Sequence, residues 1–274
     1  MITFSKSDPS NNLRSLAYLF IAFLTVPMTI NTSTASDVIN PPKIDGPFSE
    51  FHLARLYYQP TAEHYWHPPG RPWWRIDWPE AEKHLTSGLS RYTRLDSAND
   101  SAHISLMDNA IFDYPYLFAQ QVGRWQLSEE EITRLAEYLK RGGFMLADDI
   151  HGPQQWQRVQ EVFSRALPMY RIETISPDSA QLAIVFPIDE LTQIPGRRHV
   201  VGLRDDGSAV VRMPHTPQQW LGIKDENGRL IVAFNLNMDM GDAWEHADDA
   251  TYPNAMTALA YKVGINYIIY SMTH

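Results

Sequence analysis

Short apolar runs bounded by turn residues predict several β-strands along the chain. In the first half these runs lie at residues 51–58, 103–108 and 144–147. The run 144–147 (FMLA) has no polar position, which is typical of a strand buried on both faces of a parallel sheet. In the second half the candidate strands are less regular and lie at residues 171–176, 199–204 and 230–235.

Apolar residues three or four positions apart predict helices between these strands. The clearest helix begins at Ser128, which forms a capping box with Glu131, and it ends at the glycine pair 142–143. Other helices are predicted to begin at Asp77 as an N-cap, at Gly152 and at Pro253. The polar, acidic stretch 237–249 is predicted to be a loop.

The order of these elements predicts the fold class. Alternating strands and helices are typical of an open α/β sheet that is mostly parallel and has helices on both faces. The pair Asn227-Gly228 stands between two strand-like runs and predicts an inserted β-hairpin region in the second half. No composition change divides residues 51–274, so we expect them to form a single domain.

The first 36 residues have the three parts of a secretory signal peptide. Lys6 and Arg14 precede or flank the uncharged stretch 15–30, and small polar residues follow it, so that cleavage after residue 35 or 36 fits equally well. We therefore expect an exported, periplasmic protein, with residues 37–50 as a proline-rich leader. In the alternative, residues 15–30 remain as an inner-membrane anchor, although a span usually needs about 20 apolar residues. In that case the protein would contact the membrane through this segment alone.

Composition and charge narrow the function classes. The chain has 274 residues, with 23 Lys and Arg against 32 Asp and Glu, a net charge of −9. This acidic balance argues against a nucleic-acid partner, which requires a basic surface. The absence of cysteine excludes disulfides, thiolate metal sites and a cysteine nucleophile. No glycine-rich phosphate motif and no G-x-S-x-G elbow occurs, so no cofactor other than a divalent metal is expected.

Several segments resemble the DUF4159 family of exported or membrane-attached bacterial proteins. They are FHLARLYY, WPEAEKHL, YLKRGGFMLADDIHGPQQW, NMDMGDAWEH and GINYIIY, and they extend over roughly residues 50–272. The resemblance implies a class I glutamine amidotransferase-like fold, an open α/β sheet of flavodoxin-like layout. It implies no established activity. Amidotransferases use a cysteine nucleophile, and since this chain has no cysteine, that chemistry is excluded.

The first candidate site follows the buried strand and comprises Asp148, Asp149 and His151. Open α/β sheets bind ligands at the carboxyl ends of their strands. Two carboxylates and an imidazole in that position suit a divalent cation or an acid–base pair. The alternative is structural, with one aspartate capping the next helix and the other pairing with an arginine.

The second candidate site is a metal site at Asp239, Asp242 and Glu245 in the acidic stretch. Its spacing departs from the calcium-loop pattern of EF-hands, and a solvated acidic loop is the alternative. Trp244 favours a site, because a solvated loop has little use for a tryptophan. Convergence of both acidic segments on one sheet edge would be a stronger indication than either segment alone.

The third candidate is an aromatic loop that contains Trp66, His67, Arg71 and Trp73. Stiff, proline-rich aromatic loops bind saccharides and protein partners. Alternatively, the tryptophans cover the sheet edge. Two functions follow from these candidates. The first is a non-catalytic module that binds an envelope saccharide or a protein. The second is a cell-envelope hydrolase that acts on carbohydrate or peptide through carboxylate-activated or metal-activated water.

Overall fold

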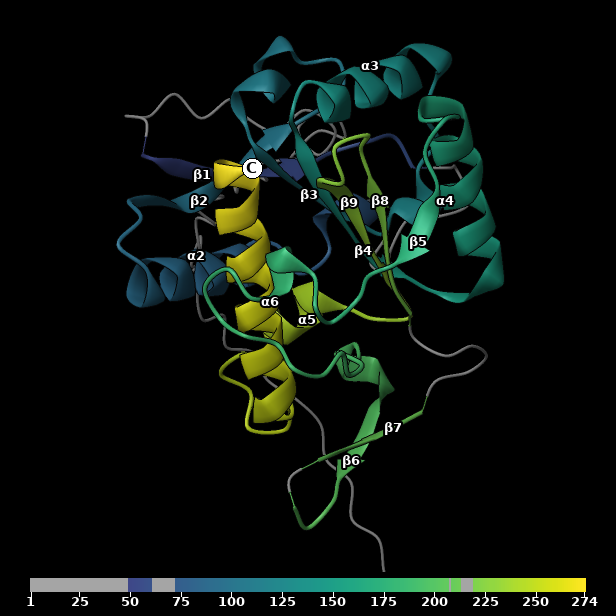
Figure 1. Ribbon diagram of the computed structural model, residues 1–274. Helices are drawn as coiled ribbons and strands as arrows, with labels where there is room; N and C mark the ends of the chain where they lie inside the picture. The colour runs from purple at the N-terminus through teal and green to yellow at the C-terminus, as the bar shows by residue number, and fades with distance from the viewer. Residues whose placement is uncertain (1–48, 61–71, 207, 213–218) are drawn as a thin grey trace, which may run out of the picture. The chain divides into compact units, whose positions relative to one another are not determined.

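A seven-stranded sheet organises the computed structural model, which describes residues 49–60, 72–206, 208–212 and 219–274 (Figure 1). Its strand order is β2-β1-β3-β4-β9-β8-β5. The strands are β1 (Phe51–Leu56), β2 (Ser97–Ile104), β3 (Tyr116–Gln120), β4 (Phe144–Ile150), β5 (Ile172–Thr174), β8 (Gln219–Lys224) and β9 (Leu230–Leu236). All neighbouring pairs from β2 to β9 are parallel, whereas β8 and β5 pair antiparallel at one edge. The predicted mostly parallel α/β sheet is therefore confirmed.

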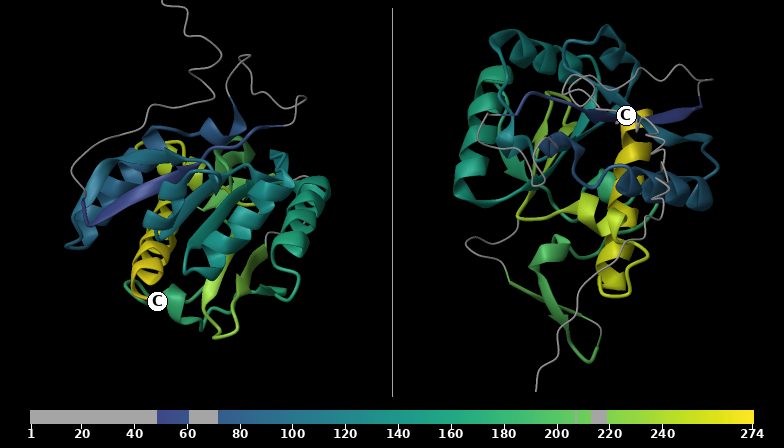
Figure 2. Two further views of the ribbon diagram at one scale, coloured as in Figure 1. Left: turned by 90° about the horizontal axis from the view of Figure 1, so that it is seen from above. Right: turned by 180° about the vertical axis from the view of Figure 1, so that it is seen from behind.

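The sheet is buried on both faces, as the uninterrupted apolar run of β4 predicts. Successive β4 residues contribute to two different hydrophobic clusters: Phe144 and Leu146 to one, Met145 and Ala147 to the other. Helices α3 (Glu129–Lys140) and α4 (Gly152–Ala166) pack on one face. Helices α2 (Glu80–Tyr92), α5 (Met240–Glu245) and α6 (Asn254–Thr273) pack on the other face (Figure 2).

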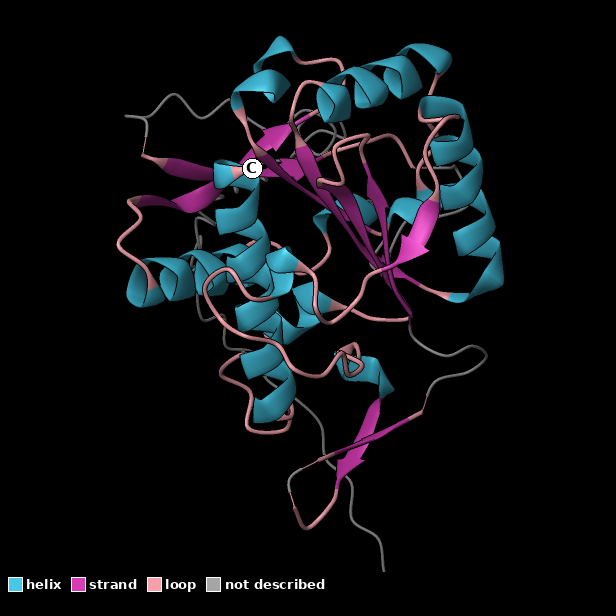
Figure 3. Cartoon of the chain, in the orientation of Figure 1, coloured by secondary structure: helices cyan, strands magenta, loops and turns pink. Residues whose placement is uncertain are grey.

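Local signals located several boundaries correctly. Ser128 and Glu131 form the predicted capping box at the start of α3, and Gly142 takes the left-handed conformation (φ 107°) directly after this helix. The Asn227-Gly228 turn joins β8 to β9, but this hairpin belongs to the main sheet. A second hairpin, formed by β6 (Val200–Leu203) and β7 (Ala209–Val211), makes a separate two-stranded sheet (Figure 3). We call residues 200–212 the arm.

Four sequence predictions were wrong. The first strand ends at Leu56 and not at residue 58. The strand predicted at 103–108 occupies residues 97–104, where it pairs with β1. The sequence analysis missed β3 (YLFAQ), a short apolar segment with no helical period. The N-cap of α2 is Pro79. The predicted cap, Asp77, has a left-handed backbone, and it contributes to the start of the helix through its carbonyl, which accepts the N–H of Ala81.

A fifth error concerns the acidic stretch 237–249, which is not a solvated loop. It contains α5, whose Met240, Ala243 and Trp244 are fully buried. Within the described residues, no helix is long and apolar enough to cross a membrane. The predicted signal peptide 1–36 and nearly all of the leader 37–50 lie outside the described residues.

Short 3₁₀ helices complete the described chain: η1 (Trp73–Arg75), η2 (Asn109–Asp113), η3 (Val122–Arg124), η4 (Ala180–Leu182) and η5 (Arg197–His199). Two of them flank the carboxyl edge of the sheet. The segment of η1 leads into Asp77, and η5 leads into the arm. A buried arginine fixes the first segment, because Arg55 on β1 pairs with Glu82 on α2 and donates to the carbonyls of Trp74 (2.7 Å) and Ile76 (3.0 Å).

Candidate functional site

Strained backbone conformations gather at the carboxyl edge of the parallel strands. Four non-glycine residues in the described part of the chain have positive φ: Asp77, Gln121, Asp149 and Asn237. Gln121 follows β3, Asp149 lies near the end of β4, and Asn237 follows β9. Such conformations cost of order 1–3 kcal/mol each and persist only where surrounding contacts enforce them. Their concentration at the carboxyl edge singles this edge out as the candidate site.

A cleft of about 300 Å³ opens at this edge. It is lined by Ile76, Asp77, Asp149, Arg197, Arg198, Asp239, Asp242, Glu245 and His246. Five carboxylates thus share one small space with two guanidinium groups. The two acidic segments of the sequence, which are about 90 positions apart, therefore converge in the folded protein.

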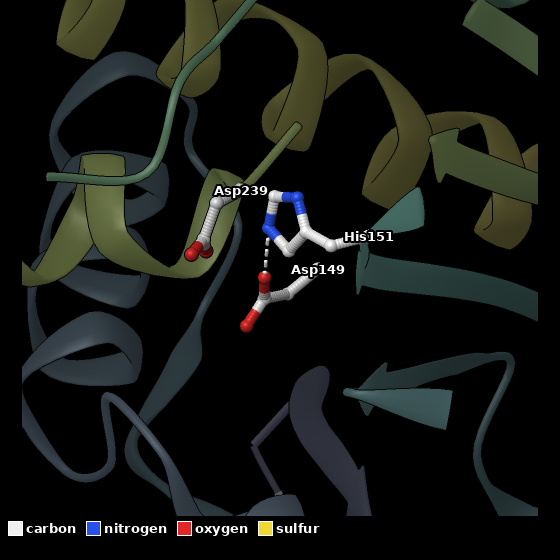
Figure 4. A group of neighbouring side chains, drawn as sticks. All are labelled: Asp149, His151 and Asp239. Atoms are coloured by element: carbon white, nitrogen blue, oxygen red, sulfur yellow. Dashed lines mark ion pairs between the residues drawn. The ribbon is translucent and has the colours of Figure 1, made fainter. Parts of the chain in front are cut away.

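Asp149 and Asp239 of this lining form a close group with the adjacent His151 (Figure 4). Each offers a ligand atom, and these atoms lie within 4.8 Å of one another. The Oδ1 atom of Asp149 is 2.5 Å from Nε2 of His151, while its Oδ2 accepts a hydrogen bond from the side chain of Gln121. Asp149 is only 1% exposed, and its Oδ1 makes an ion pair without a hydrogen bond of normal geometry.

Asp77, Asp239 and Asp242 form a second group, whose ligand atoms also lie within 4.8 Å of one another. Asp239 belongs to both groups. Asp239 is the N-cap of α5, and its Oδ1 accepts the backbone N–H of Asp242 at 2.9 Å. Asp77 receives a hydrogen bond from the side-chain amide of Gln120 at the end of β3. A third group, Asp242, Glu245 and His246, lies toward the solvent.

The electrostatics of the cleft are those of crowded, buried carboxylates. Burial, together with the charges of Asp242 and Asp149, raises the pKa of Asp77 well above its ordinary value. Burial and the neighbouring aspartates raise the pKa of Asp239 in the same way. Burial acts on Asp149 too, but His151, Arg198 and Gln121 outweigh it and hold the pKa of Asp149 below its usual range. Asp77 and Asp239 therefore hold their protons to a higher pH than an ordinary aspartate does, whereas Asp149 loses its proton at a lower pH.

Asp148 has a different role from its neighbour. Its carboxylate accepts hydrogen bonds from the backbone N–H groups of Met240 (2.9 Å) and Gly241 (2.8 Å) and from Asn235 (2.7 Å). Burial raises the pKa of Asp148 to about 6, although these hydrogen bonds oppose the rise. Asp148 is fully buried and does not line the cleft, so it holds the start of α5 instead of facing a ligand.

The aromatic candidates do not form a platform in the described part of the chain. Trp244 is 0% exposed and packs edge-on against Phe118, 5.4 Å between ring centres, so its side chain belongs to the core. Trp73 is buried as well, and the guanidinium of Arg124 covers its ring at 4.0 Å. Trp66, His67 and Arg71 lie outside the described residues.

Sequence reasoning missed several residues of the cleft. Asp77 was interpreted as a helix cap, and no local signal separates a capping aspartate from one that turns into a cleft. Arg197 and Arg198 precede the arm, and only the fold brings them to the strand ends. For Gln121, the signal would have been its position directly after β3, had that strand been recognised.

Comparison with known proteins gives a family and no activity. The model of the family described as "Domain of unknown function (DUF4159)" matches residues 52–272, so the chain belongs to this family. A search among curated proteins found no match.

Proposed function

We propose that this DUF4159 protein is a divalent-cation-dependent hydrolase whose reaction takes place in the acidic cleft. The observation that carries the proposal is the convergence of Asp149, His151 and Asp239, whose ligand atoms lie within 4.8 Å of one another. Of the two functions expected from the sequence, a hydrolase fits this geometry better than a non-catalytic module. The module was expected to contact its ligand through Trp66, Trp73 and Trp244 together with the acidic strand ends. Trp73 and Trp244 are buried, and Trp66 lies outside the described residues.

The charge balance supports a cation. Five carboxylates line the cleft, and one of its two arginines, Arg197, is occupied by Asp249 at 3.4 Å and by Thr251 at 2.7 Å. Buried carboxylates without compensating charge are costly, and a bound cation removes that cost. The buried Oδ1 of Asp149 pairs with His151 without a hydrogen bond of normal geometry, and a cation would replace that contact as the partner of both groups. One imidazole among several carboxylates suits Mn²⁺, Mg²⁺ or Zn²⁺.

The layout of the sheet also supports a site at this edge. The five parallel strands follow the order second, first, third, fourth, fifth along the chain, which is the flavodoxin-like order. In such sheets ligands bind where the order reverses, between the first and third strands. Gln120 is the last residue of β3 and Gln121 follows it, and the side chain of Gln120 donates a hydrogen bond to Asp77, so these residues lie at that point. We also propose that the fold is related to that of the class I glutamine amidotransferases, although this chain lacks their cysteine nucleophile.

Hydrolysis requires a nucleophilic water and a group that takes and returns its proton. A bound cation would make the water more acidic. Asp77 is suited to the proton transfer, because its carboxyl group lies within 4.8 Å of the nearest ligand atoms of Asp239 and Asp242. Its raised pKa would fall toward the working range once a cation is present. The water oxygen would then bond to the electrophilic centre, the bond from that centre to the leaving group would break, and Asp77 would pass the proton to the leaving group.

We place this activity in the bacterial cell envelope, on the strength of the signal-like residues 1–36 and the acidic, cysteine-free chain. The substrates proposed at this level are envelope carbohydrates or peptides.

Calorimetric titration with Mn²⁺, Mg²⁺ and Zn²⁺ tests the proposal. We expect the protein to bind at least one of these cations at pH 7.5, and Asp149→Asn and Asp239→Asn to weaken binding at least tenfold. Asp178→Asn, at an exposed position beyond β5, is the matched control and should bind as the parent does. Absence of binding for all three cations, or equal binding by the cleft variants, would refute the proposal. Activity on 4-nitrophenyl esters, glycosides and phosphates should disappear with chelator and return with the cation.

A further inference from the structure

We infer that the substrate carries a phosphoryl group and that Arg198 binds this group beside the cation. The inference rests on the proposed function and names its substrate class. It is carried by a guanidinium group that the fold brings to the acidic site and then leaves without a hydrogen-bond partner.

Arg198 lies on η5 and lines the cleft. Its Nη2 atom is 3.9 Å from Oδ1 of Asp149, too far for a hydrogen bond, and its side chain is 46% exposed. Within the described part of the chain, its guanidinium makes no hydrogen bond. The preceding Arg197 behaves differently, because Asp249 and Thr251 hold its guanidinium. Of these two cleft arginines, Arg198 is therefore the one available to a ligand.

The backbone that carries Arg198 is fixed against the carboxylates. Arg197 donates its backbone N–H to Oδ2 of Asp242 at 2.7 Å, and the hydroxyl of Tyr252 donates to the carbonyl of Pro195 at 2.6 Å. At Gly196, an added Cβ would lie 3.0 Å from Asp239 Oδ2 and 3.1 Å from Asp242 Oδ2. Glycine thus allows η5 to approach the metal-ligating face closely. The guanidinium is held near the proposed cation by a segment that is already ordered, which favours binding.

A phosphoryl group is the ligand that this combination fits. A guanidinium presents paired donors that match two phosphoryl oxygens, and a divalent cation takes another oxygen. Cation and arginine together stabilise the charge that develops in phosphoryl transfer. The cleft volume of about 300 Å³ is at the small end for ligand sites and suits a compact charged group. A neutral saccharide or peptide would bring no charge to pair with Arg198.

The reaction balances without a further reagent. A water oxygen bonds to phosphorus, the phosphorus–oxygen ester bond breaks, and the leaving oxygen receives a proton. The products are an alcohol and inorganic phosphate. Because the carboxylates repel a phosphoryl dianion, the phosphoryl group should bind only when the cation is present. By linkage, it should strengthen cation binding by the same factor.

Calorimetry with phenyl phosphate, with and without Mn²⁺, tests the inference; Mg²⁺ or Zn²⁺ replaces Mn²⁺ if the protein prefers it. We expect Arg198→Ala to weaken phenyl phosphate binding at least tenfold and to change the affinity for the cation less than twofold. Arg204→Ala, at an exposed position in the arm, is the matched control and should bind phenyl phosphate as the parent does. Arg198→Lys should recover part of the affinity, because lysine keeps the charge and loses the paired donors.

The outcomes distinguish a failure of the proposed hydrolase function from a failure of the phosphoryl inference. If no cation binds, the proposed hydrolase fails. If a cation binds but phenyl phosphate does not, or benzoate binds equally well, the phosphoryl inference is wrong. Equal binding of phenyl phosphate by Arg198→Ala and the parent, or binding that does not depend on the cation, also overturns it.

Discussion

Asp239→Asn should stabilise the cation-free protein, although it removes a residue from the centre of the site. Asp239 is 2% exposed, and its pKa is raised by burial and then by Asp149, Asp242 and Asp77. Asparagine has nearly the same volume and keeps an Oδ1 atom that can accept the N–H of Asp242. The substitution therefore removes a negative charge and leaves the helix cap of α5 in place.

The magnitude follows from linkage. The folded-state pKa of Asp239 lies above its unfolded value, so the stability that the neutral carboxyl group contributes is lost as the pH rises from the unfolded-state pKa through the folded-state pKa. Each unit of that difference costs about 1.4 kcal/mol. Because a buried carboxylate among other carboxylates is costly, we expect Asp239→Asn to raise the free energy of unfolding by about 1–2 kcal/mol at pH 8. For a chain of this size the gain corresponds to a rise in Tm of roughly 3–6 °C. It should vanish below about pH 4, where the carboxyl group is protonated in both states.

Urea denaturation followed by circular dichroism, in chelator at pH 4 to 8, measures this difference. Asp178→Asn serves again as the exposed control and should leave the free energy of unfolding unchanged. With a binding cation the order should reverse, because the cation stabilises the parent and not the variant. A variant that is less stable than the parent at pH 8 in chelator would show that the carboxylates of the cleft are not in electrostatic conflict. The physical argument for the cation would then lose its basis.

Three further outcomes are expected. Glu82→Gln should lower the free energy of unfolding by about 3–5 kcal/mol in urea denaturation, because it leaves the buried guanidinium of Arg55 without its ion pair. Gly264→Ala should cost about 1–3 kcal/mol in the same assay, since the added Cβ would lie 2.7 Å from the ring of Trp244. Carboxyl resonances followed by NMR should give Asp148 a titration midpoint near pH 6, and a midpoint near 4 would contradict its burial between strand and helix.

Much of the fold could be predicted because its signals are local. The capping box at Ser128, the apolar run of β4 and the Asn227-Gly228 turn each depend on residues close together in the sequence. The run of β4 also predicted that Asp148 and Asp149 would stand at the carboxyl edge of the sheet, and they lie just before the end of this strand. From the sequence, convergence of the two acidic segments on one sheet edge would be a stronger indication of a site than either segment alone. The parallel pairing of β4 with β9 brings the two segments together.

The remainder could not be predicted, because it depends on contacts between distant residues. Asp77 reaches the cleft through a left-handed backbone that Arg55 fixes by bonding to the neighbouring carbonyls. Arg198 reaches the same cleft only because the segment before the arm packs against α5. Trp244 was misjudged because the composition of its segment is polar, whereas its position on α5 turns it into the core.

The two aspartates at the end of β4 divide the construction of the cleft between them. Asp149 turns into the cleft, where His151 and Arg198 keep it ionised. Asp148 stays within the protein and binds the N–H groups of Met240 and Gly241, the two residues that follow Asp239. Because those three residues are consecutive, the hydrogen bonds of Asp148 determine where Asp239 stands relative to Asp149. Asp148 therefore sets the position of Asp239, one proposed cation ligand, and is itself the neighbour of Asp149, the other. A substitution at Asp148 should disturb the cleft, although Asp148 does not line it.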